Sequence, residues 1–241
     1  MNLYAGQVLH VDLTSGEIQG VETNQDWLKD YIGGWGLAAR YFYDRVDPKT
    51  DPLSADNALV IMTGPLCGTL APTASRTCLV SKSPHTGTIF ESNVGGAFGP
   101  ELKFAGYDGI VITGQSDHPV YLRIEDDAIT VEDAAAIWGK GIFETEAWLA
   151  DTMGPGVKSL SIGPAGENLV SYACIGSEAY RQLGRGGAGA LFGAKKLKAI
   201  ACKGTGGVQV ANMSVFWEKV THYKESNLLT GENLWAKEDG T

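Results

Sequence analysis

The sequence contains few cysteines, and their spacing excludes the usual local metal and redox motifs. Its 241 residues include four cysteines, at positions 67, 78, 174 and 202. No two of them are separated by only two residues, as they are in zinc sites, redox pairs and iron–sulfur loops. Isolated cysteines of this kind usually behave as small buried apolar residues. We therefore expect buried thiols in strands, and the sequence places no cluster ligands in this chain.

Basic residues are also scarce, with 19 Lys and Arg against 28 Asp and Glu and a formal net charge of −9. General binding to nucleic acid or to an anionic membrane needs clustered Lys and Arg, so neither partner is expected. An anionic ligand must be held by a few local residues. No basic N-terminal stretch with an apolar run and no segment as long as a membrane span is found. We expect a cytoplasmic protein, and a homo-oligomer is left open.

Glycine, by contrast, is abundant. It makes up 32 of the 241 residues, nearly twice the usual share of about 7%, and it shows no collagen-like period. This content predicts many tight turns or close backbone approaches. With 44% hydrophobic residues, the chain can also bury a proper core.

Hydrophobic periodicity predicts a succession of short strands and helices. Residues 7–22 alternate around a turn and predict a β-hairpin, whereas residues 26–46 have helical spacing interrupted by Gly33-Gly34-Trp35-Gly36, which predicts two helices. Further strands are expected at residues 58–62, 77–81, 109–113, 120–124, 129–132, 160–162, 172–175 and 199–203. Further helices are expected after Gly96, over residues 141–153 and after Gly187.

The pattern changes after the glycine-rich stretch at residues 204–207. From Ser214 to Leu228 the spacing is helical, with the serine as the expected cap, and from residue 231 onward the sequence is polar and aperiodic. These features predict one domain over residues 1–208 and the beginning of a truncated helical second domain over residues 209–241.

The two parts of the first domain resemble each other in sequence. Ile61-Met62-Thr63-Gly64-Pro65 resembles Leu160-Ser161-Ile162-Gly163-Pro164. In the same order along the chain, Cys78 pairs with Cys174, Asn93-Val94-Gly95 with Gln182-Leu183-Gly184, and Phe98-Gly99 with Phe192-Gly193. The order is kept while the spacing drifts, which predicts an internal duplication. Two such halves can pack about a pseudo-twofold axis and hold two copies of one ligand or a ligand with two similar lobes.

The repeated element is an amide side chain followed by glycines and then a helix, once at Asn93-Val94-Gly95-Gly96 and once at Gln182-Leu183-Gly184-Arg185. Glycines there expose backbone N–H groups and let a phosphate come close. Arg76, Arg181 and Arg185 lie in or near these segments and can add bidentate contacts to phosphate. The spacing matches neither the dinucleotide fingerprint nor the phosphate loop. We therefore predict binding of a phosphorylated ligand in duplicate.

Several strings resemble the N-terminal domain of the tungsten-containing aldehyde:ferredoxin oxidoreductases and their molybdopterin-type relatives. The resemblance covers about residues 4 to 204. Its most specific part is the run from Ser92 to Asp108, and it also includes Gly64-Pro65-Leu66, Ala71-Pro72-Thr73, Arg76, Ser81-Lys82-Ser83-Pro84, Ile137-Trp138-Gly139-Lys140, the run from Ile162 to Val170, and Gly184-Arg185-Gly186-Gly187.

The resemblance implies an α+β fold, an internally duplicated domain of two mixed β-sheets related by a pseudo-twofold with flanking helices. This domain would be the base on which a tungsten (or molybdenum) bis-pterin cofactor rests. Arg76, Asn93 and Gly95 would bind one pterin and Arg181, Gln182 and Gly184 the other, with Gly96 and Arg185 beside them. The backbone carbonyls of Asn93 and Gln182 would hold a Mg ion between the pterin phosphates, which suits the preference of Mg for oxygen ligands.

The family reaction implied is oxidation of an aldehyde to a carboxylic acid, with electrons passing through a 4Fe-4S cluster to ferredoxin or another electron-transfer subunit. The catalytic residues, the substrate pocket and the cluster ligands would lie in downstream domains or a partner chain, so no catalytic residue is assigned here. Glu101 and Asp108 are interpreted as a helix-surface carboxylate and a turn residue, and the tryptophans as packing residues. Other readings stay open: a non-catalytic pterin-binding module, an inactive fragment, or a different reaction such as reduction of an activated aromatic acid.

Overall fold

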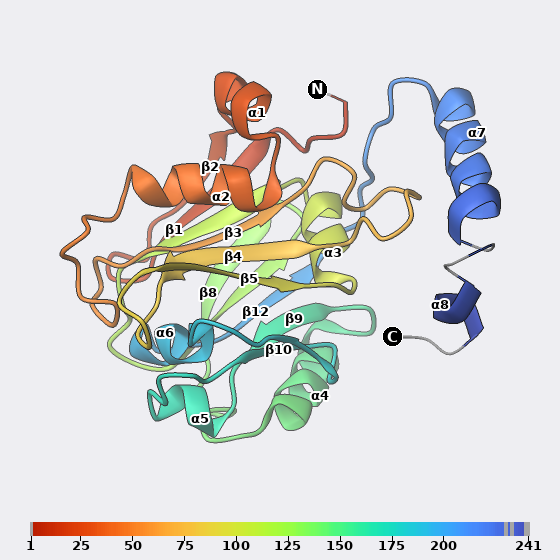
Figure 1. The fold of residues 1–241 in the computed structure, drawn as a ribbon. Coiled ribbons are helices and arrows are strands. Elements are labelled where there is room, and N and C mark those ends of the chain that lie inside the picture. The colour runs from red at the N-terminus through yellow and green to blue at the C-terminus, as the bar shows by residue number, and fades with distance from the viewer. Residues whose placement is uncertain (1, 229–230, 232–233, 239–241) are drawn as a thin grey trace.

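Two six-stranded sheets form the framework of the protein in the computed structural model, which describes residues 2–228, 231 and 234–238 (Figure 1). Sheet A contains β1 (Gln7–Asp12), β2 (Ile18–Glu22), β3 (Leu59–Thr63), β4 (Thr77–Lys82), β5 (Ile89–Val94) and β6 (Gly109–Thr113). Sheet B contains β7 (Val120–Glu125), β8 (Ala128–Asp133), β9 (Lys158–Ser161), β10 (Ile175–Ser177), β11 (Arg181–Leu183) and β12 (Leu197–Lys203). Both sheets mix parallel and antiparallel pairs, and helices flank them, so the α+β class is confirmed.

The two sheets have the same topology, which confirms the internal duplication. Starting from β5, the order in sheet A is β5-β4-β3-β6-β1-β2, and starting from β11 the order in sheet B is β11-β10-β9-β12-β7-β8. In each sheet one pair is parallel, β1 with β6 and β7 with β12, and the other pairs are antiparallel. Every strand of one half therefore has a counterpart in the other.

The strand register shows which residues are equivalent. Met62 lies opposite Gly109 and Cys78, and Ser161 lies opposite Ala199 and Gly176. One strand further out, Asn93 lies opposite Cys78. In the second sheet, Gln182 lies opposite Gly176. Asn93 and Gln182 therefore occupy the same position in the two halves, as the sequence repeat predicts.

Two other pairings suggested by the sequence are wrong in register. Cys78 corresponds to Gly176 and not to Cys174, because β10 begins only at Ile175. For the same reason the strand expected at residues 172–175 lies later in the chain. Phe98 opens α3 (Phe98–Phe104) and Ala188 opens α6 (Ala188–Ala194), so Phe98 corresponds to Ala188 and not to Phe192. Glycines and small apolar residues recur at these element ends, which made neighbouring alignments look equally good.

Apolar side chains form one central cluster and two outer ones. The central cluster joins the inner faces of both sheets with residues from α3 and α6, among them Leu9, Ile61, Phe98, Leu122, Leu160 and Phe192. Helices α1 (Gln25–Tyr31) and α2 (Gly34–Tyr43) cover the outer face of sheet A, and α4 (Ile142–Met153) covers that of sheet B. A short helix, α5 (Pro164–Glu167), packs against α6. The two halves of the domain thus share the central cluster.

The predicted break between the first two helices is confirmed. Asn24 caps α1 by accepting hydrogen bonds from the backbone N–H groups of Asp26 and Trp27, both at 3.0 Å. The helix ends at Tyr31, and the next residue, Ile32, has a φ of 64°. A Cβ on Gly33 would lie 3.0 Å from the carbonyl oxygen of Thr63 at the end of β3, so the glycine lets the helix break approach the end of that strand.

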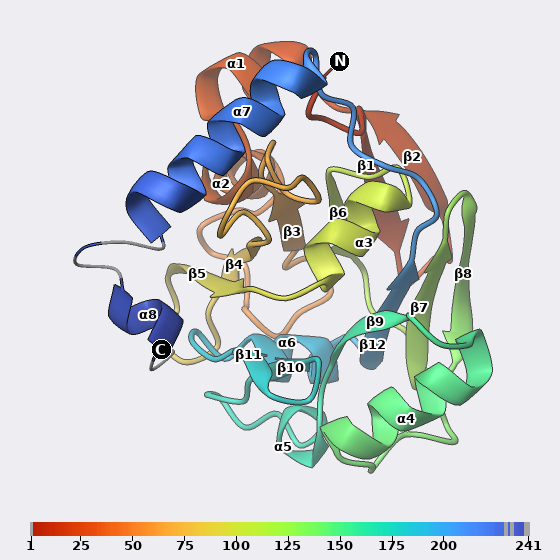
Figure 2. The ribbon, with the colours of Figure 1, turned by 90° about the vertical axis from the view of Figure 1, so that its right-hand side faces the viewer.

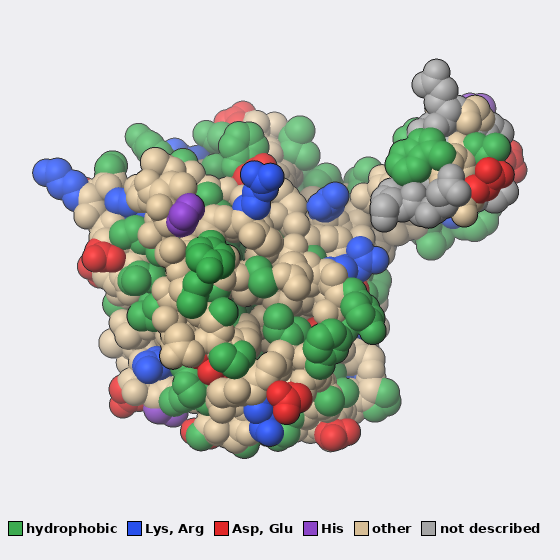
Figure 3. All heavy atoms as spheres, turned by 60° about the horizontal axis from the view of Figure 1, so that its bottom comes forward, with side chains coloured by type: hydrophobic (Ala, Val, Ile, Leu, Met, Phe, Trp, Pro, Cys, Tyr) green, Lys and Arg blue, Asp and Glu red, His purple; other side chains and the backbone are tan. Residues whose placement is uncertain are grey.

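The C-terminal segment stands clear of the two sheets (Figures 1 and 3). It contains α7 (Met213–Tyr223), η1 (Lys224–Leu228) and α8 (Leu234–Glu238). The cap of α7 is Asn212, whose side chain accepts from the backbone N–H of Val215 at 3.0 Å, so the predicted serine cap at Ser214 is wrong. The expected second domain spans residues 209–241, and part of it lies outside the described residues. The domain boundary stays a prediction. Within the described part of the chain, no helix combines the length and apolarity needed to cross a membrane.

Candidate functional site

The predicted site residues gather where the edges of the two sheets meet. Strand β5 ends one sheet and β11 ends the other, and the two strands contact each other (Figures 1 and 2). The backbone N–H of Arg185 donates to Ser92 Oγ at 3.3 Å. A Cβ on Gly95 would lie 3.5 Å from Arg181 Nη1. The two edge strands thus run antiparallel to each other, as expected for two copies related by a twofold axis. We call residues 90–97 and 178–186 the seam.

The amides and the first glycines are matched across the seam. Asn93 and Gln182 are both exposed and equivalent in register. Gly95 and Gly184 lie two residues further along the chain, just beyond the ends of the two strands. Nothing lies within 4 Å of a Cβ built on Gly184, so this glycine borders open space into which a ligand can fit. Because β5 and β11 are edge strands, they also have backbone groups that their own sheets leave unpaired.

The arginines, however, do not occupy matched positions. The register that pairs Cys78 with Gly176 puts Cys174 at the position of Arg76. The Cys174 thiol donates a hydrogen bond to Gln182 Oε1. Likewise, the register of β5 and β11 pairs Arg181 with Ser92. The two halves therefore present the same backbone but different cations to a ligand.

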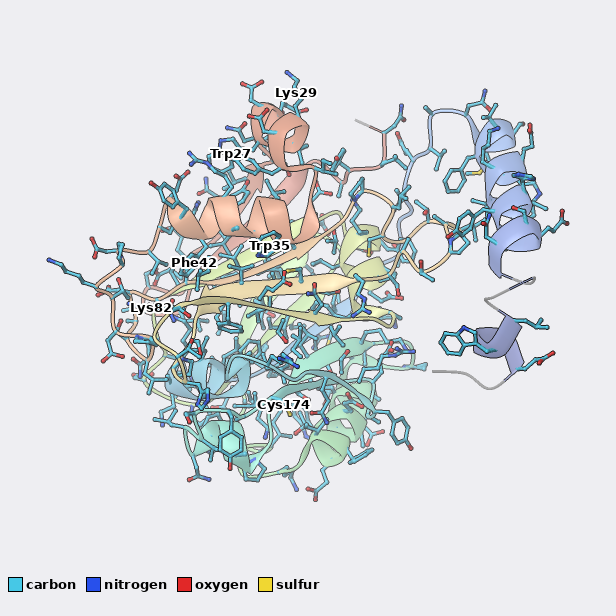
Figure 4. All side chains as sticks on the ribbon, viewed as in Figure 1. Trp27, Lys29, Trp35, Phe42, Lys82 and Cys174 are labelled. Atoms are coloured by element: carbon cyan, nitrogen blue, oxygen red, sulfur yellow. The ribbon has the colours of Figure 1, made fainter. Side chains whose placement is uncertain are left out.

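A cavity of about 430 Å³ lies beside the first half of the seam. It is lined by Arg76, Cys78 and Asn93 together with the glycine break before α2 and the loop after β3. Trp35 also lines it and has 58% of its side chain exposed, and Figure 4 shows it at the start of α2 beside sheet A. The sequence interpretation of the tryptophans as packing residues missed this one. Its position between Gly34 and Gly36 was the available signal.

Glu178 is a second residue that sequence reasoning missed. Its Oε1 accepts a hydrogen bond from the backbone N–H of Ala97 at 2.8 Å, and its Oε2 lies 3.4 Å from Arg181 Nε. A Cβ on Gly96 would collide with the same carboxylate, and the φ of Gly96 is 103°. Gly96 is therefore favoured by its backbone conformation, which a residue with a side chain would strain.

Three arginines in and beside the seam are suited to an anionic ligand. Among the residues that the structure describes, Arg76 and Arg185 are exposed and form no ion pair, and Arg181 has only the 3.4 Å contact with Glu178. Unpaired guanidinium groups in an acidic chain are suited to bind phosphate. No group of three His, Cys, Asp or Glu side chains in the described ranges could hold a metal ion. The residues present thus fit a phosphorylated ligand bound by arginines and backbone groups.

Glu101 and Asp108, interpreted from the sequence as a helix-surface carboxylate and a turn residue, have structural roles. Asp108 is 1% exposed and accepts hydrogen bonds from the backbone N–H groups of Ala5 and Gly6, from Thr23 Oγ1 and from Lys103 Nζ. It is a buried centre of the first half, so its interpretation as a turn residue was incomplete. Glu101 accepts from the backbone N–H of Gly204 at 2.9 Å. Neither side chain lines the seam.

The fold and the seam define a duplicated α+β domain in which the edge strands of the two sheets meet. The chain belongs to the aldehyde ferredoxin oxidoreductase family, since the family model of the N-terminal domain matches residues 8–204. A tungsten-containing aldehyde ferredoxin oxidoreductase of Pyrococcus abyssi is 44% identical over 95% of this chain and 38% of its own length. The WOR-like subunit of an aliphatic sulfonate oxidoreductase of Pyrococcus furiosus is 37% identical over 86% of this chain and 35% of that relative.

A solved structure shares the whole architecture. It is the active site complex BamBC of benzoyl coenzyme A reductase with 1,5-dienoyl-CoA, with a TM-score of 0.90 and 39% sequence identity, and the match covers 94% of this chain and 36% of that chain. The present chain thus spans well under half the length of these relatives. The resemblance seen in the sequence is confirmed, and the family is one of oxidoreductases that includes tungsten-containing members.

Proposed function

We propose that this chain binds the two pterins of a tungsten cofactor and is the cofactor base of an oxidoreductase. The observation that carries the proposal is the equivalence of Asn93 and Gln182 across the seam, near Arg76 and Arg185, which form no ion pair within the described part of the chain. A ligand with two similar phosphorylated lobes has the same symmetry. The names of the relatives support tungsten as the metal, and molybdenum is the alternative.

Each half of the seam would bind one pterin. In the first half Arg76, Asn93 and Gly95 would provide a guanidinium, a polar strand edge and a close backbone approach. In the second half Arg181, Gln182, Gly184 and Arg185 would do the same.

Backbone groups complete the proposed site. The Asn93 and Gln182 backbone carbonyls, on neighbouring edge strands, are the groups we propose for a Mg ion between the phosphates, since Mg prefers oxygen ligands. Gly96 would shape the loop through its left-handed backbone.

The cofactor supplies the redox chemistry when bound, and the protein orients it and sets its surroundings. The arginines and the backbone N–H groups of the seam would hold the phosphates of the pterins, which fixes the orientation of the cofactor above β5 and β11. The residues of this chain thus bind and position, and we assign none of them a proton-transfer role. Substrate groups and a 4Fe-4S cluster would come from further polypeptide.

For the complete enzyme we propose oxidation of an aldehyde to a carboxylic acid, with electrons passing to ferredoxin, in the cytoplasm. A second candidate is reduction of an activated aromatic acid, which the structural match to a benzoyl coenzyme A reductase complex favours. Two assays of the intact enzyme separate these candidates. The first function predicts turnover of an aldehyde with oxidised ferredoxin, and the second predicts turnover of an aromatic CoA thioester with reduced ferredoxin.

The cofactor proposal is tested by metal and pterin analysis of protein purified without oxygen from its native host. We expect tungsten together with two pterins per chain. The same analysis of Arg185→Gln should show reduced pterin content, whereas Arg123→Gln, which loses the same charge on β7 away from the seam, should match the wild type. Wild-type protein without metal and pterin would contradict the proposal and favour a non-catalytic module or an inactive fragment.

A further inference from the structure

The turn that joins β10 to β11 has an unusual backbone. Glu178 and Ala179 have φ values of 51° and 60°, although residues with a side chain seldom adopt this left-handed region. Glu146 of α4 lies against the turn: burial raises the pKa of its carboxyl, while the backbone N–H groups of Ala179 and Glu178 act in the opposite direction. Such conformations persist where the surrounding structure imposes them. Here the turn directs the side chain of Glu178 toward the first half of the domain.

The Glu178 carboxylate contacts both halves of the seam. It accepts from the Ala97 N–H at 2.8 Å and lies 3.4 Å from Arg181 Nε and 3.9 Å from Lys158 Nζ. Its side chain is only 22% exposed. The carboxyl of Glu146 also acts electrostatically on Glu178. The backbone N–H and the two cations in contact with the Glu178 carboxylate are groups that a phosphate also prefers.

We propose that Glu178 is a positioning residue of the anion site, which holds the loop of residues 95–97 and the Arg181 side chain in place and competes with a phosphate for the Arg181 guanidinium. This inference rests on the proposed function, since it concerns the same seam. Glu178 lies outside the repeated sequence motif, and its role makes the two duplicated halves functionally different.

The consequence is that the two halves bind phosphate unequally. The β4–β5 hairpin of the first half has no acidic residue at the position equivalent to Glu178. Counted along β4 and β10 the equivalent residue is Val80, and counted along β5 and β11 it is Ile89. The second half therefore places a carboxylate directly against its arginine, whereas Glu91 of the first half acts electrostatically on Cys78 and forms no ion pair among the described residues. A phosphate at the second site must displace or share the contacts of the Glu178 carboxylate.

Two substitutions separate the hydrogen bond from the charge. In Glu178→Gln the side-chain oxygen can still accept from the Ala97 N–H, but the negative charge is gone. In Glu178→Ala both are lost. Hydrogen exchange of the full chain without ligand should show the Ala97 amide protected in the wild type and in Glu178→Gln, and unprotected in Glu178→Ala. If the Ala97 amide stays protected in both variants, the positioning role is overturned.

Titration of the same proteins with inorganic phosphate tests the competition. We expect Glu178→Gln to bind phosphate about fivefold more tightly than the wild type at low ionic strength, with a smaller gain in high salt because salt screens exposed charges. Glu218→Gln on α7 changes the net charge equally and should leave the affinity unchanged. Adding Arg181→Gln to Glu178→Gln should remove the gain. An affinity for phosphate that Glu178→Gln does not increase, or a gain that survives the loss of Arg181, would overturn the proposal.

Failure of this inference can be distinguished from failure of the cofactor proposal. Tighter phosphate binding by Glu178→Gln, with no pterin in the native protein, would support the role of Glu178 and contradict the cofactor proposal. Pterin in the native protein, with unchanged phosphate binding in Glu178→Gln, would contradict the role of Glu178 alone.

Discussion

Arg185 and Ser92 join the two halves of the domain directly, because the backbone N–H of Arg185 donates a 3.3 Å hydrogen bond to Ser92 Oγ. The strand register makes Ser92 equivalent to Arg181, and counting two residues beyond each edge strand makes Arg185 equivalent to Gly96. Arg181 in turn packs against Gly96. The same pair of positions therefore makes contact on both sides of the pseudo-twofold axis, once through a serine and once through an arginine.

The close approach of the seam predicts different effects for two neighbouring glycines. A Cβ on Gly186 would collide with the ring of Phe90, and the φ of Gly186 is 79°. We expect Gly186→Ala to lower the free energy of unfolding by about 2–3 kcal/mol, from overpacking and a strained backbone. Gly184→Ala, whose Cβ would meet nothing within 4 Å, should retain wild-type stability and lose pterin. Urea denaturation measures the first effect, and equal stabilities of the two variants would contradict this view of the seam.

Cysteine accessibility provides a chemical test of the site. Burial raises the pKa of the Cys67 thiol to about 11 and that of Cys78 to about 12, and it raises the pKa of Cys202 still further. Cys174 is the partly exposed one among the four, and Figure 4 places it among the strands of sheet B. Because the thiolate is the reactive form, iodoacetamide should modify Cys174 alone in the native protein.

A ligand at the second half of the seam should slow this reaction, since Cys174 donates to the side chain of Gln182. Mass spectrometry of the alkylated protein, with and without bound cofactor, measures both results. Equal labelling of the buried thiols would show that the core opens on the time scale of the reaction.

The buried ion pair of Lys103 and Asp108 should contribute much more stability than an exposed pair. Their charged atoms are 2.6 Å apart, and the side chains are 1% and 2% exposed. Asp108→Asn leaves Lys103 buried without its counter-charge, which typically costs about 3–5 kcal/mol. Asp26→Asn makes the same chemical change in the exposed pair with Lys29 and should cost at most about 1 kcal/mol. Thermal unfolding of both variants provides the comparison, and similar losses would contradict it.

Lys195 predicts a pH dependence of stability in the alkaline range. It is 2% exposed, donates to the carbonyl of Gly114 at 2.7 Å, and burial lowers its pKa to about 8 from the usual 10.5. Between these values the unfolded chain binds more protons than the folded one, so this contribution to stability increases with pH. It is fully present above about pH 10.5 and lost below about pH 8.

Urea denaturation across this pH window tests the prediction by comparing the wild type with Lys195→Met. The free energy of unfolding of the wild type should rise relative to that of the variant as the pH increases from about 8 to about 10.5. Lys29→Met, at an exposed position, should show no such difference in slope. A constant difference between wild type and Lys195→Met would mean that Lys195 keeps its ordinary pKa.

Much of the fold could be predicted from the sequence because it depends on local signals. The helix break at Gly33 and Gly34 and the strand ending at Thr63 follow from periodicity and turn residues. The duplication was visible because both halves keep glycines at the ends of equivalent strands. Register was harder, since a shift of two residues keeps side chains on the same face, and this is why Cys78 was paired with Cys174 in place of Gly176.

The candidate site was predicted in part for a related reason. An amide followed two residues later by a glycine recurs in both halves, so Asn93 and Gln182 could be paired from sequence, although the strands that contain them, β5 and β11, were not predicted. Glu178 could not, because its role depends on a left-handed turn and on a contact with Ala97 of the other half. Trp35 was interpreted as a packing residue despite its flanking glycines, and the structure shows that it is exposed and lines the same cavity as Arg76.

The central apolar cluster has a consequence for how such a domain is put together. Leu9 and Ile61 of one half meet Leu122 and Leu160 of the other in that cluster, so neither half covers its own inner face. A polypeptide with only one half would have to associate with a second copy about a twofold axis to bury this surface. The domain therefore has the organisation of a symmetric dimer whose two subunits are fused into one chain between β6 and β7.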